Sequence, residues 1–189
     1  VSFLKRSKRF KYFFHMSQDG ADAMKNLYNF FSDKNPKYTN YFKVFSGCSD
    51  KNLCNPIILI FDNELSNKCK PLHSFVSHIE LSSSDKDKLK EDLCMKIIDE
   101  GNLFLVTNQL VDGKAECEIE DLFDETTRNH VIAGKTFSSN DKADKEKHYR
   151  KEIFANFIQS NYKSINFDNF RQMLNNIVKV IAEFAGTEG

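Results

Sequence analysis

Two carboxylates stand where the sequence predicts the end of a buried strand. Asp62 and Glu64 directly follow residues 57–61, an unbroken apolar run typical of a strand covered by helices on both faces of a sheet. Ligands of open α/β sheets bind in the crevice outside the carboxyl ends of the strands, so this pair is a candidate site for a hard cation such as Mg²⁺. Acidic residues also follow strands as turn formers and helix caps. The motif by itself leaves both interpretations open.

A second acidic segment follows the strand predicted at residues 102–107. Residues 112–125 hold seven acidic side chains and one lysine. Because this segment comes soon after the strand, we expect it to return to the sheet edge where Asp62 and Glu64 lie. Glu120 or Asp121 could then supply a further oxygen ligand. The sequence contains no phosphate-binding glycine-rich loop and no spacing that indicates a Ser/His/Asp or Cys/His catalytic site.

The charge is unevenly distributed along the chain, although the formal net charge is zero. Residues 1–51 hold ten Lys or Arg against four Asp or Glu. The zero net charge argues against a simple cationic surface for nucleic acid. A basic end and an acidic site on one molecule could suit a metal enzyme that acts on a polyanion. The same distribution could equally reflect two solvated faces.

The first half of the chain must position these acids. A strand is predicted at residues 10–16, followed by a turn at 17–20. The helix after the turn has an inward stripe at Met24, Leu27, Tyr28 and Phe31. With the strand at 57–61, these elements would form a βαβ unit. Residues 32–55 are predicted to be a long loop, or a loop with one short strand. Their Lys, Tyr and Phe residues could stack on bases, although aromatic residues in a connection more often pack on the core.

Two helical segments are predicted between the strands at 57–61 and 102–107. The first is opened by Pro71, and its apolar residues are Leu72, Phe75, Val76 and Ile79. The second begins at residues 84–87, which have the spacing of a capping box, and Gly101 ends it. Its apolar stripe consists of Leu89, Leu93 and Ile97.

The C-terminal part is predicted to be helical. Residues 134–147 are polar and charged and are expected to form a mobile loop. Residues 148–158 are predicted to be a helix, with Lys151 off the apolar stripe. Its inward residues would be Tyr149, Ile153, Phe154 and Phe157. The most regular amphipathic pattern is formed by Phe167, Phe170, Leu174, Ile177, Ile181 and Phe184. This stripe could mark a homodimer interface, but packing on the chain's own sheet explains it more simply.

Together, these elements predict a single α/β domain with a mainly parallel central sheet flanked by helices. The sheet would be formed by residues 1–134, and residues 144–186 would be the C-terminal helices. Five scattered cysteines without a C-x-x-C pair favour a reducing cytosol. Because no apolar run reaches about 18 residues, we expect a cytoplasmic protein without a membrane partner. The start at Val1 suggests a fragment of a longer protein.

In their order and spacing, six segments resemble the Toprim endonuclease-like domain at the C-terminus of some retron-type reverse transcriptases. This domain is related to the Toprim domain of OLD-family nucleases. The matching segments are 11–22 (KYFFHMSQDGAD), 62–64 (DNE), 103–107 (LFLVT), 119–123 (IEDLF), 149–154 (YRKEIF) and 165–170 (INFDNF). They cover most of the chain. No strand ending in Glu-Gly precedes Phe10, so the resemblance implies that the first family strand is missing and would lie before Val1.

The resemblance implies a metal-dependent nuclease. Toprim domains hold Mg²⁺ with an acidic pair at a strand end, and a further glutamate serves as ligand or as acid and base. By resemblance, Asp62 and Glu64 form the pair, with Glu64 in place of the usual second Asp. Glu120 and Asp121 would add carboxylates, and Lys151 would face a phosphate. The implied cofactor is Mg²⁺ or Mn²⁺. The implied partners are DNA or RNA and the reverse transcriptase part of the same polypeptide.

Three hypotheses for the function remain. The first is metal-dependent cleavage of DNA or RNA phosphodiesters by the intact protein. The second is a non-catalytic module that binds nucleic acid or protein on the same fold. The third, phosphoryl transfer to Asp62, needs an acidic pair after an earlier strand, which residues 15–17 do not supply. Convergence of Asp62, Glu64 and Glu120 would favour the first hypothesis over the second. For this chain alone we expect inactivity.

Overall fold

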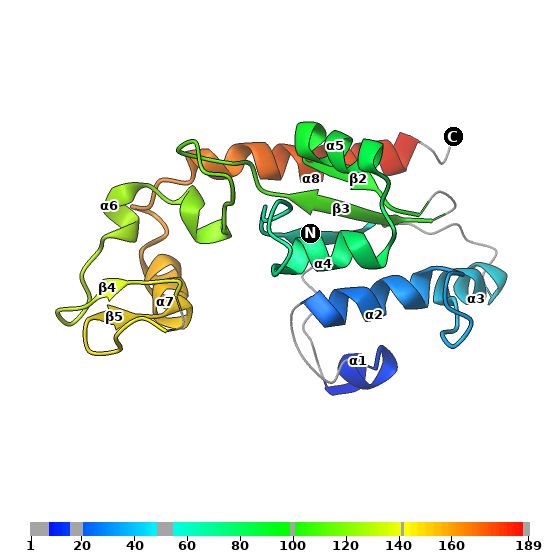
Figure 1. Ribbon diagram of the computed structural model, residues 1–189, viewed down its shortest axis with the longest axis horizontal. Coiled ribbons are helices and arrows are strands. Elements are labelled where there is room, and N and C mark those ends of the chain that lie inside the picture. Colours follow the sequence, from blue (N-terminus) through cyan, green and yellow to red (C-terminus); the bar gives the residue numbers. More distant parts are fainter. Residues whose placement is uncertain (1–7, 16–20, 49–54, 99–100, 141, 187–189) are drawn as a thin grey trace.

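A three-stranded sheet lies at the centre of the computed structural model, which describes residues 8–15, 21–48, 55–98, 101–140 and 142–186 (Figure 1). Its strands are β1 (Ile57–Phe61), β2 (Cys94–Lys96) and β3 (Leu103–Thr107), in the order β1-β3-β2. β1 runs parallel to β3, and β2 runs antiparallel to it. The α/β class is therefore confirmed. The sheet is mixed, however, because only one of its two pairings is parallel.

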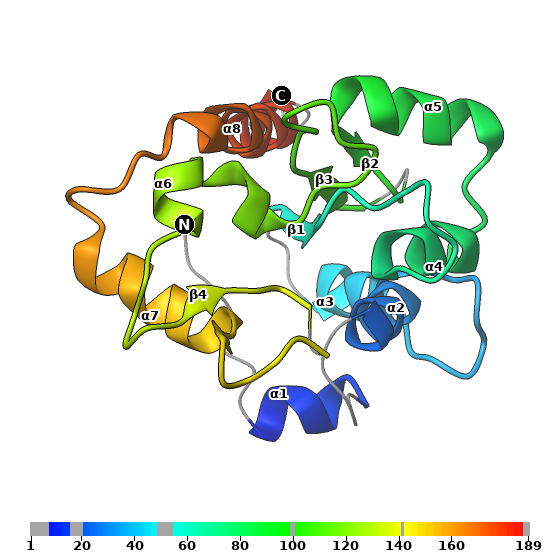
Figure 2. The same cartoon turned by 60° about the vertical axis from the view of Figure 1, so that its left-hand side comes forward.

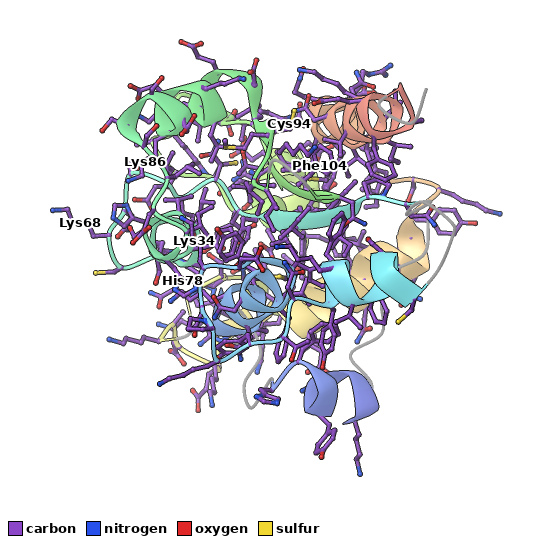
Figure 3. The ribbon with its side chains drawn as sticks, turned by 90° about the vertical axis from the view of Figure 1, so that its right-hand side faces the viewer. Lys34, Lys68, His78, Lys86, Cys94 and Phe104 are labelled. Carbon is purple, nitrogen blue, oxygen red and sulfur yellow. The ribbon has the colours of Figure 1, made fainter. Side chains whose placement is uncertain are left out.

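Helices cover both faces of this sheet. Alternate residues of β3 point to opposite faces, and all five are buried. Leu103 and Leu105 belong to the core beneath α2 (Ala21–Phe31) and α4 (Pro71–His78). Phe104 and Val106 pack on the other side, against α8 (Arg171–Gly186). Figure 3 shows Phe104 on the α8 side of the sheet and His78 on the side of α2 and α4.

Several predicted elements are confirmed. β1, β3 and α2 occur where the sequence predicts them, and Pro71 opens α4 in its first turn. The prediction that β1 is buried on both faces was wrong in part, since Ile60 is 37% exposed. The reason is that β1, among the described residues, pairs with β3 alone and so lies at one edge of the sheet.

The predicted strand at residues 10–16 was wrong. The chain forms helix α1 (Lys8–Phe13) there, and Met16 lies outside the described residues. The ring of Phe14 packs on Phe30 and Phe31 of α2 instead of extending the sheet. The described residues therefore contain no strand before α2 that would complete the expected βαβ unit. Residues 32–55 hold a helix, α3 (Tyr41–Cys48), where a loop or a short strand was expected.

The predicted helix through Ile97 was also wrong. Helix α5 (Ser83–Asp92) is capped by Ser82, whose side chain accepts a hydrogen bond from the Asp85 backbone N–H. The helix ends because Leu93 adopts a left-handed conformation with φ of 58°. Cys94 then begins β2, which pairs with β3. The pairing partner, which lies farther along the chain, decides that these residues form a strand.

A second small sheet lies beyond residue 134. After the 3₁₀ turn η1 (Ile119–Leu122) and helix α6 (Glu125–Arg128), strand β4 (Thr136–Phe137) pairs in parallel with β5 (His148–Tyr149). Strand formation therefore continues past residue 134, and β4 begins inside the predicted loop. Tyr149 belongs to a strand, since helix α7 (Lys151–Asn161) starts later than predicted. Ile153, expected to face inward, is exposed.

The last helix faces the core with a stripe that overlaps the predicted one only in part, since Phe170, Ile177 and Phe184 pack there as predicted. After the 3₁₀ turn η2 (Asp168–Phe170), α8 buries Met173 and Val180 and packs Ile177 and Phe184 against the same core. Leu174 and Ile181, predicted to face inward, are exposed. Apolar residues occupy more than half of the circumference of this helix, so periodicity alone could not select the buried side. No helix of the described ranges is long and apolar enough to cross a membrane.

Candidate functional site

The acidic segment predicted to return to the end of β1 does so. Asn63, next to Asp62, forms an isolated antiparallel bridge with Cys117. Each of these two residues donates its backbone N–H to the carbonyl of the other, at 2.9 Å. This bridge places η1 beside the last residues of β1, and the expectation drawn from the sequence is confirmed (Figure 2).

Two buried asparagines hold this junction together. Asn63 follows β1 and Asn108 follows β3. The Asn108 side-chain oxygen accepts from the Asn63 backbone N–H at 3.0 Å, and the Asn63 amide donates to the Asn108 carbonyl at 2.9 Å. The Asn108 amide also donates to the Cys117 carbonyl at 3.0 Å. Sequence reasoning missed both residues. The pattern that could have predicted them is an asparagine one or two positions after each of the two parallel strands.

Asp62 is oriented by the first turn of η1. The Ile119 backbone N–H donates to its Oδ1 at 2.8 Å. Burial raises the pKa of Asp62 from its ordinary value of 3.8 to about 6, against the opposing effects of this hydrogen bond and of the Lys151 charge. The negative charges of Glu120 and Glu64 contribute to the rise in pKa. Asp62 therefore interacts electrostatically with both carboxylates that the sequence analysis grouped with it.

Glu64 is almost completely buried, with 3% of its surface exposed. Its charge is balanced by Lys70, whose Nζ lies 2.5 Å from Glu64 Oε1. Lys70 is positioned by the start of α4, because it is the residue immediately before Pro71. The same Nζ lies 3.5 Å from Glu118 Oε1. The hydrogen bond to Glu64 raises the pKa of Lys70, so this lysine remains a cation.

Lys151 reaches the site from the first position of α7. Its Nζ lies 3.0 Å from Glu118 Oε2 and 3.0 Å from Glu120 Oε2. Partial burial lowers the pKa of Lys151, but the hydrogen bonds to Glu120 and Glu118 outweigh that effect and raise the pKa overall. The lysine predicted to face a phosphate thus bridges two glutamates that are two residues apart.

We call this group of side chains the β1-edge cluster. Its members are Asp62, Glu64, Lys70, Glu118, Glu120 and Lys151. Four of them were predicted from the sequence, whereas Lys70 and Glu118 were missed. The spacing of Glu118 and Glu120 could have predicted that Glu118 belongs to this group, since two glutamates two positions apart can both contact one cation.

Asp121 is engaged elsewhere. Its Oδ1 lies 2.6 Å from Lys114 Nζ and 3.3 Å from Arg128 Nη1. Its Oδ2 accepts a hydrogen bond from the Glu118 backbone N–H at 3.0 Å, which closes the first turn of η1. Of the predicted metal ligands, the structure links Asp62, Glu64 and Glu120 through shared electrostatic partners. Asp121 instead holds the turn that carries Glu118 and Glu120.

The donor chemistry of the β1-edge cluster suits a hard divalent cation. Carboxylate oxygens are the usual ligands of Mg²⁺ in proteins. Four carboxylates and two ammonium groups leave a formal charge of −2 when all are ionised. In the described part of the chain, however, no three His, Cys, Asp or Glu side chains are arranged to hold a metal ion. Lys70 and Lys151 are the counter-charges present, so metal binding would require the carboxylates to leave these lysines.

The comparisons with known proteins do not assign this site. No family model matches the chain, and no solved structure matches its fold. The interpretation of the β1-edge cluster therefore depends on its geometry and charge.

Proposed function

We propose that the β1-edge cluster belongs to a Toprim-like domain of a retron-type reverse transcriptase, and that the intact protein cleaves DNA or RNA phosphodiesters with Mg²⁺ or Mn²⁺. The observation that carries this proposal is the contact between η1 and the end of β1. At this contact, Asp62 accepts a hydrogen bond from the Ile119 backbone N–H, and the charge of Glu120 is close enough to raise the pKa of Asp62. Carboxylates from two distant segments, residues 62–64 and 118–120, thereby meet at one end of β1.

Each residue of the cluster has a chemical role in this proposal. Asp62, Glu64 and Glu120 would hold the cation, which when bound supplies an activated water and stabilises the leaving oxygen. The residual charge of −2 is the charge that one divalent ion neutralises. Lys151 would exchange its glutamate partners for a phosphate oxygen, to which it offers a point charge. Lys70 pairs with the buried Glu64 and is its counter-charge.

A second candidate function is a non-catalytic module that binds nucleic acid or protein. The ion pairing of the cluster favours it, because Lys70 and Lys151 already balance Glu64, Glu118 and Glu120. The lack of a three-ligand group among the described residues points the same way. We therefore expect this chain by itself to bind metal weakly and to cleave little or nothing.

A calorimetric titration with Mn²⁺ tests the proposal. The 189-residue chain should show one weak site that Asp62→Ala abolishes. Asp87→Ala is the matched control, because Asp87 is an exposed acid on α5 that pairs with Lys90. If neither this chain nor a longer one with upstream sequence binds Mn²⁺, the nuclease proposal fails and the binding module remains. If the longer chain binds, cleavage of single-stranded and duplex substrates in Mg²⁺ is the next measurement.

A further inference from the structure

Three aromatic rings form a column that leads from the core to the surface. Phe30 of α2 and Tyr41 of α3 are nearly parallel, with ring centroids 5.1 Å apart and an interplanar angle of 11°. Tyr41 and Phe45, one helical turn apart on α3, continue the stack at 5.7 Å and 20°. Phe30 is buried, whereas Phe45 is 55% exposed. Because Tyr41 covers one face of the Phe45 ring, the exposed surface of Phe45 is mainly its outer face and edge.

Other rings hold this column in place from the side. Phe14 meets Phe30 edge-on at 5.5 Å and Tyr41 edge-on at 5.8 Å. Tyr38 meets Phe30 edge-on at 4.9 Å. Edge-to-face contacts of this kind are favourable and restrict ring rotation. The outermost ring, Phe45, therefore stands on a supported stack, and a planar ligand that adds to it loses little side-chain entropy.

The charge around the column suits a polyanion. The described residues 8–15 and 21–48, which form α1, α2 and α3, contain seven Lys or Arg and two Asp. Helix α3 has no acidic residue, and its one lysine, Lys43, is two positions from both Tyr41 and Phe45 and so lies on the opposite side of the helix. Lys37 directly precedes Tyr38. Lys43 pairs with Asp33, but its side chain remains 60% exposed. The segment that carries the column is therefore net positive, and Lys37 adjoins the Phe30 end of the column through Tyr38.

This surface is separate from the β1-edge cluster. Figure 1 shows α3 at the end of the molecule opposite α7, which carries Lys151. The column can therefore bind a ligand whether or not the cluster binds metal, and its function does not depend on the proposed cleavage.

We propose that the exposed face of Phe45 is a stacking platform for a base of single-stranded DNA or RNA, with Lys37 near the backbone phosphates. Stacked rings beside cations are the recurring means of holding single strands without sequence preference, because every base has a π-face. An apolar protein segment would not need near-parallel rings or a net positive surface. Duplex nucleic acid offers fewer exposed base faces and should bind more weakly.

The chain contains no tryptophan, which permits a direct test. In Phe45→Trp the indole is the only tryptophan, and a stacked base should quench its fluorescence. The probe is an oligothymidylate of about twelve nucleotides, a length within the usual site size of single-strand binding domains, added in EDTA so that no cleavage occurs. Val44→Trp, at an exposed neighbouring position of α3, is the matched control and should be quenched much less. Equal quenching of both variants, or of neither, would overturn the proposal.

Affinity measurements separate stacking from apolar docking. By fluorescence anisotropy with the labelled oligonucleotide, Phe45→Ala and Phe45→Leu should each weaken binding about five- to a hundredfold, while Phe45→Tyr stays close to wild type. Val178→Ala, an exposed apolar position on α8, should change nothing. Binding that Leu preserves but Ala loses would indicate a protein-docking surface and refute base stacking.

Two further binding measurements test whether Lys37 contacts a phosphate and whether the strand binds outside the β1-edge cluster. Lys37→Ala should lower the slope of log affinity against log salt by about 0.7, as expected for one lost phosphate contact on a single strand. Asp87→Ala, which alters an exposed acid of α5 outside the β1-edge cluster, should leave binding of the oligonucleotide in EDTA unchanged. If binding in EDTA is as strong in Phe45→Ala as in the wild type, the strand lies elsewhere and the Phe45 platform is wrong. The outcome at Phe45 can therefore differ from that of the metal titration.

Discussion

The charge of Asp62 should destabilise the folded protein at neutral pH. The pKa of this carboxyl is about 6 in the folded state, against 3.8 as its ordinary value, mainly because of burial. Between these two pH values the folded protein holds a proton that the unfolded chain has lost. The free energy of unfolding therefore falls as the pH rises from 3.8 to about 6, and it stays low above that pH. Asp62→Asn removes the charge but keeps an oxygen that can accept the Ile119 N–H.

The size of the effect follows from the difference in pKa. About two pH units at 1.36 kcal/mol each give roughly 3 kcal/mol as an upper value. Asp62 is only partly buried, and solvent screening reduces such energies, so we expect about 1–2 kcal/mol. Asp62→Asn should thus raise the free energy of unfolding by about 1–2 kcal/mol at pH 8. Near pH 3.5 the wild-type carboxyl is protonated in the folded state, and the two proteins should be nearly equal in stability.

Urea unfolding followed by circular dichroism at pH 8 and pH 3.5 measures this difference. Asp87→Asn is the control, since Asp87 lies exposed on α5 and should alter stability by less than about 0.5 kcal/mol at either pH. Destabilisation by Asp62→Asn at pH 8 would show that the carboxylate is stabilised by its surroundings. An equal increase in the free energy of unfolding of Asp62→Asn at both pH values would show that burial of the Asp62 charge does not cause the stabilisation.

Three other substitutions test the surroundings of the site, each by urea unfolding at pH 8. Lys70→Met removes the counter-charge of the buried Glu64 and should lower the free energy of unfolding by about 2–3 kcal/mol. The double variant Lys70→Met/Glu64→Gln should recover most of this loss. An unaltered urea midpoint in Lys70→Met would mean that water solvates Glu64. Asn108→Ala removes two side-chain hydrogen bonds from the buried junction and should lower the free energy of unfolding by about 1–3 kcal/mol. A loss below about 0.5 kcal/mol would contradict the proposed junction. Ser82→Ala removes the helix cap and should lower the free energy of unfolding by about 1 kcal/mol, whereas Ser84→Ala should lower it much less. A larger loss for Ser84→Ala than for Ser82→Ala would support the cap at residues 84–87 that the sequence predicts.

The sequence by itself determined the elements with strong and complete local patterns. Residues 57–61 and 103–106 are apolar runs that have few alternatives to a buried strand. Pro71 marks a helix start because its missing N–H costs nothing there. The position of Asp62 and Glu64 after a strand was also visible, as was the acidic segment that returns to them. These features depend on neighbours within a few residues, and a one-dimensional pattern contains that information.

Tertiary structure decided the rest, because burial and counter-charge come from residues distant in the chain. Residues 10–13 suit a strand or a helix, and packing beside α2 selects the helix. Cys94 begins a strand only because β3 offers an edge to pair with. Lys151 reaches Glu120 across 31 positions, a pairing that no local spacing predicts. Which acids face each other at the end of β1, and which lysines balance them, is therefore set by the three-dimensional fold, since electrostatic energy depends on distance in space.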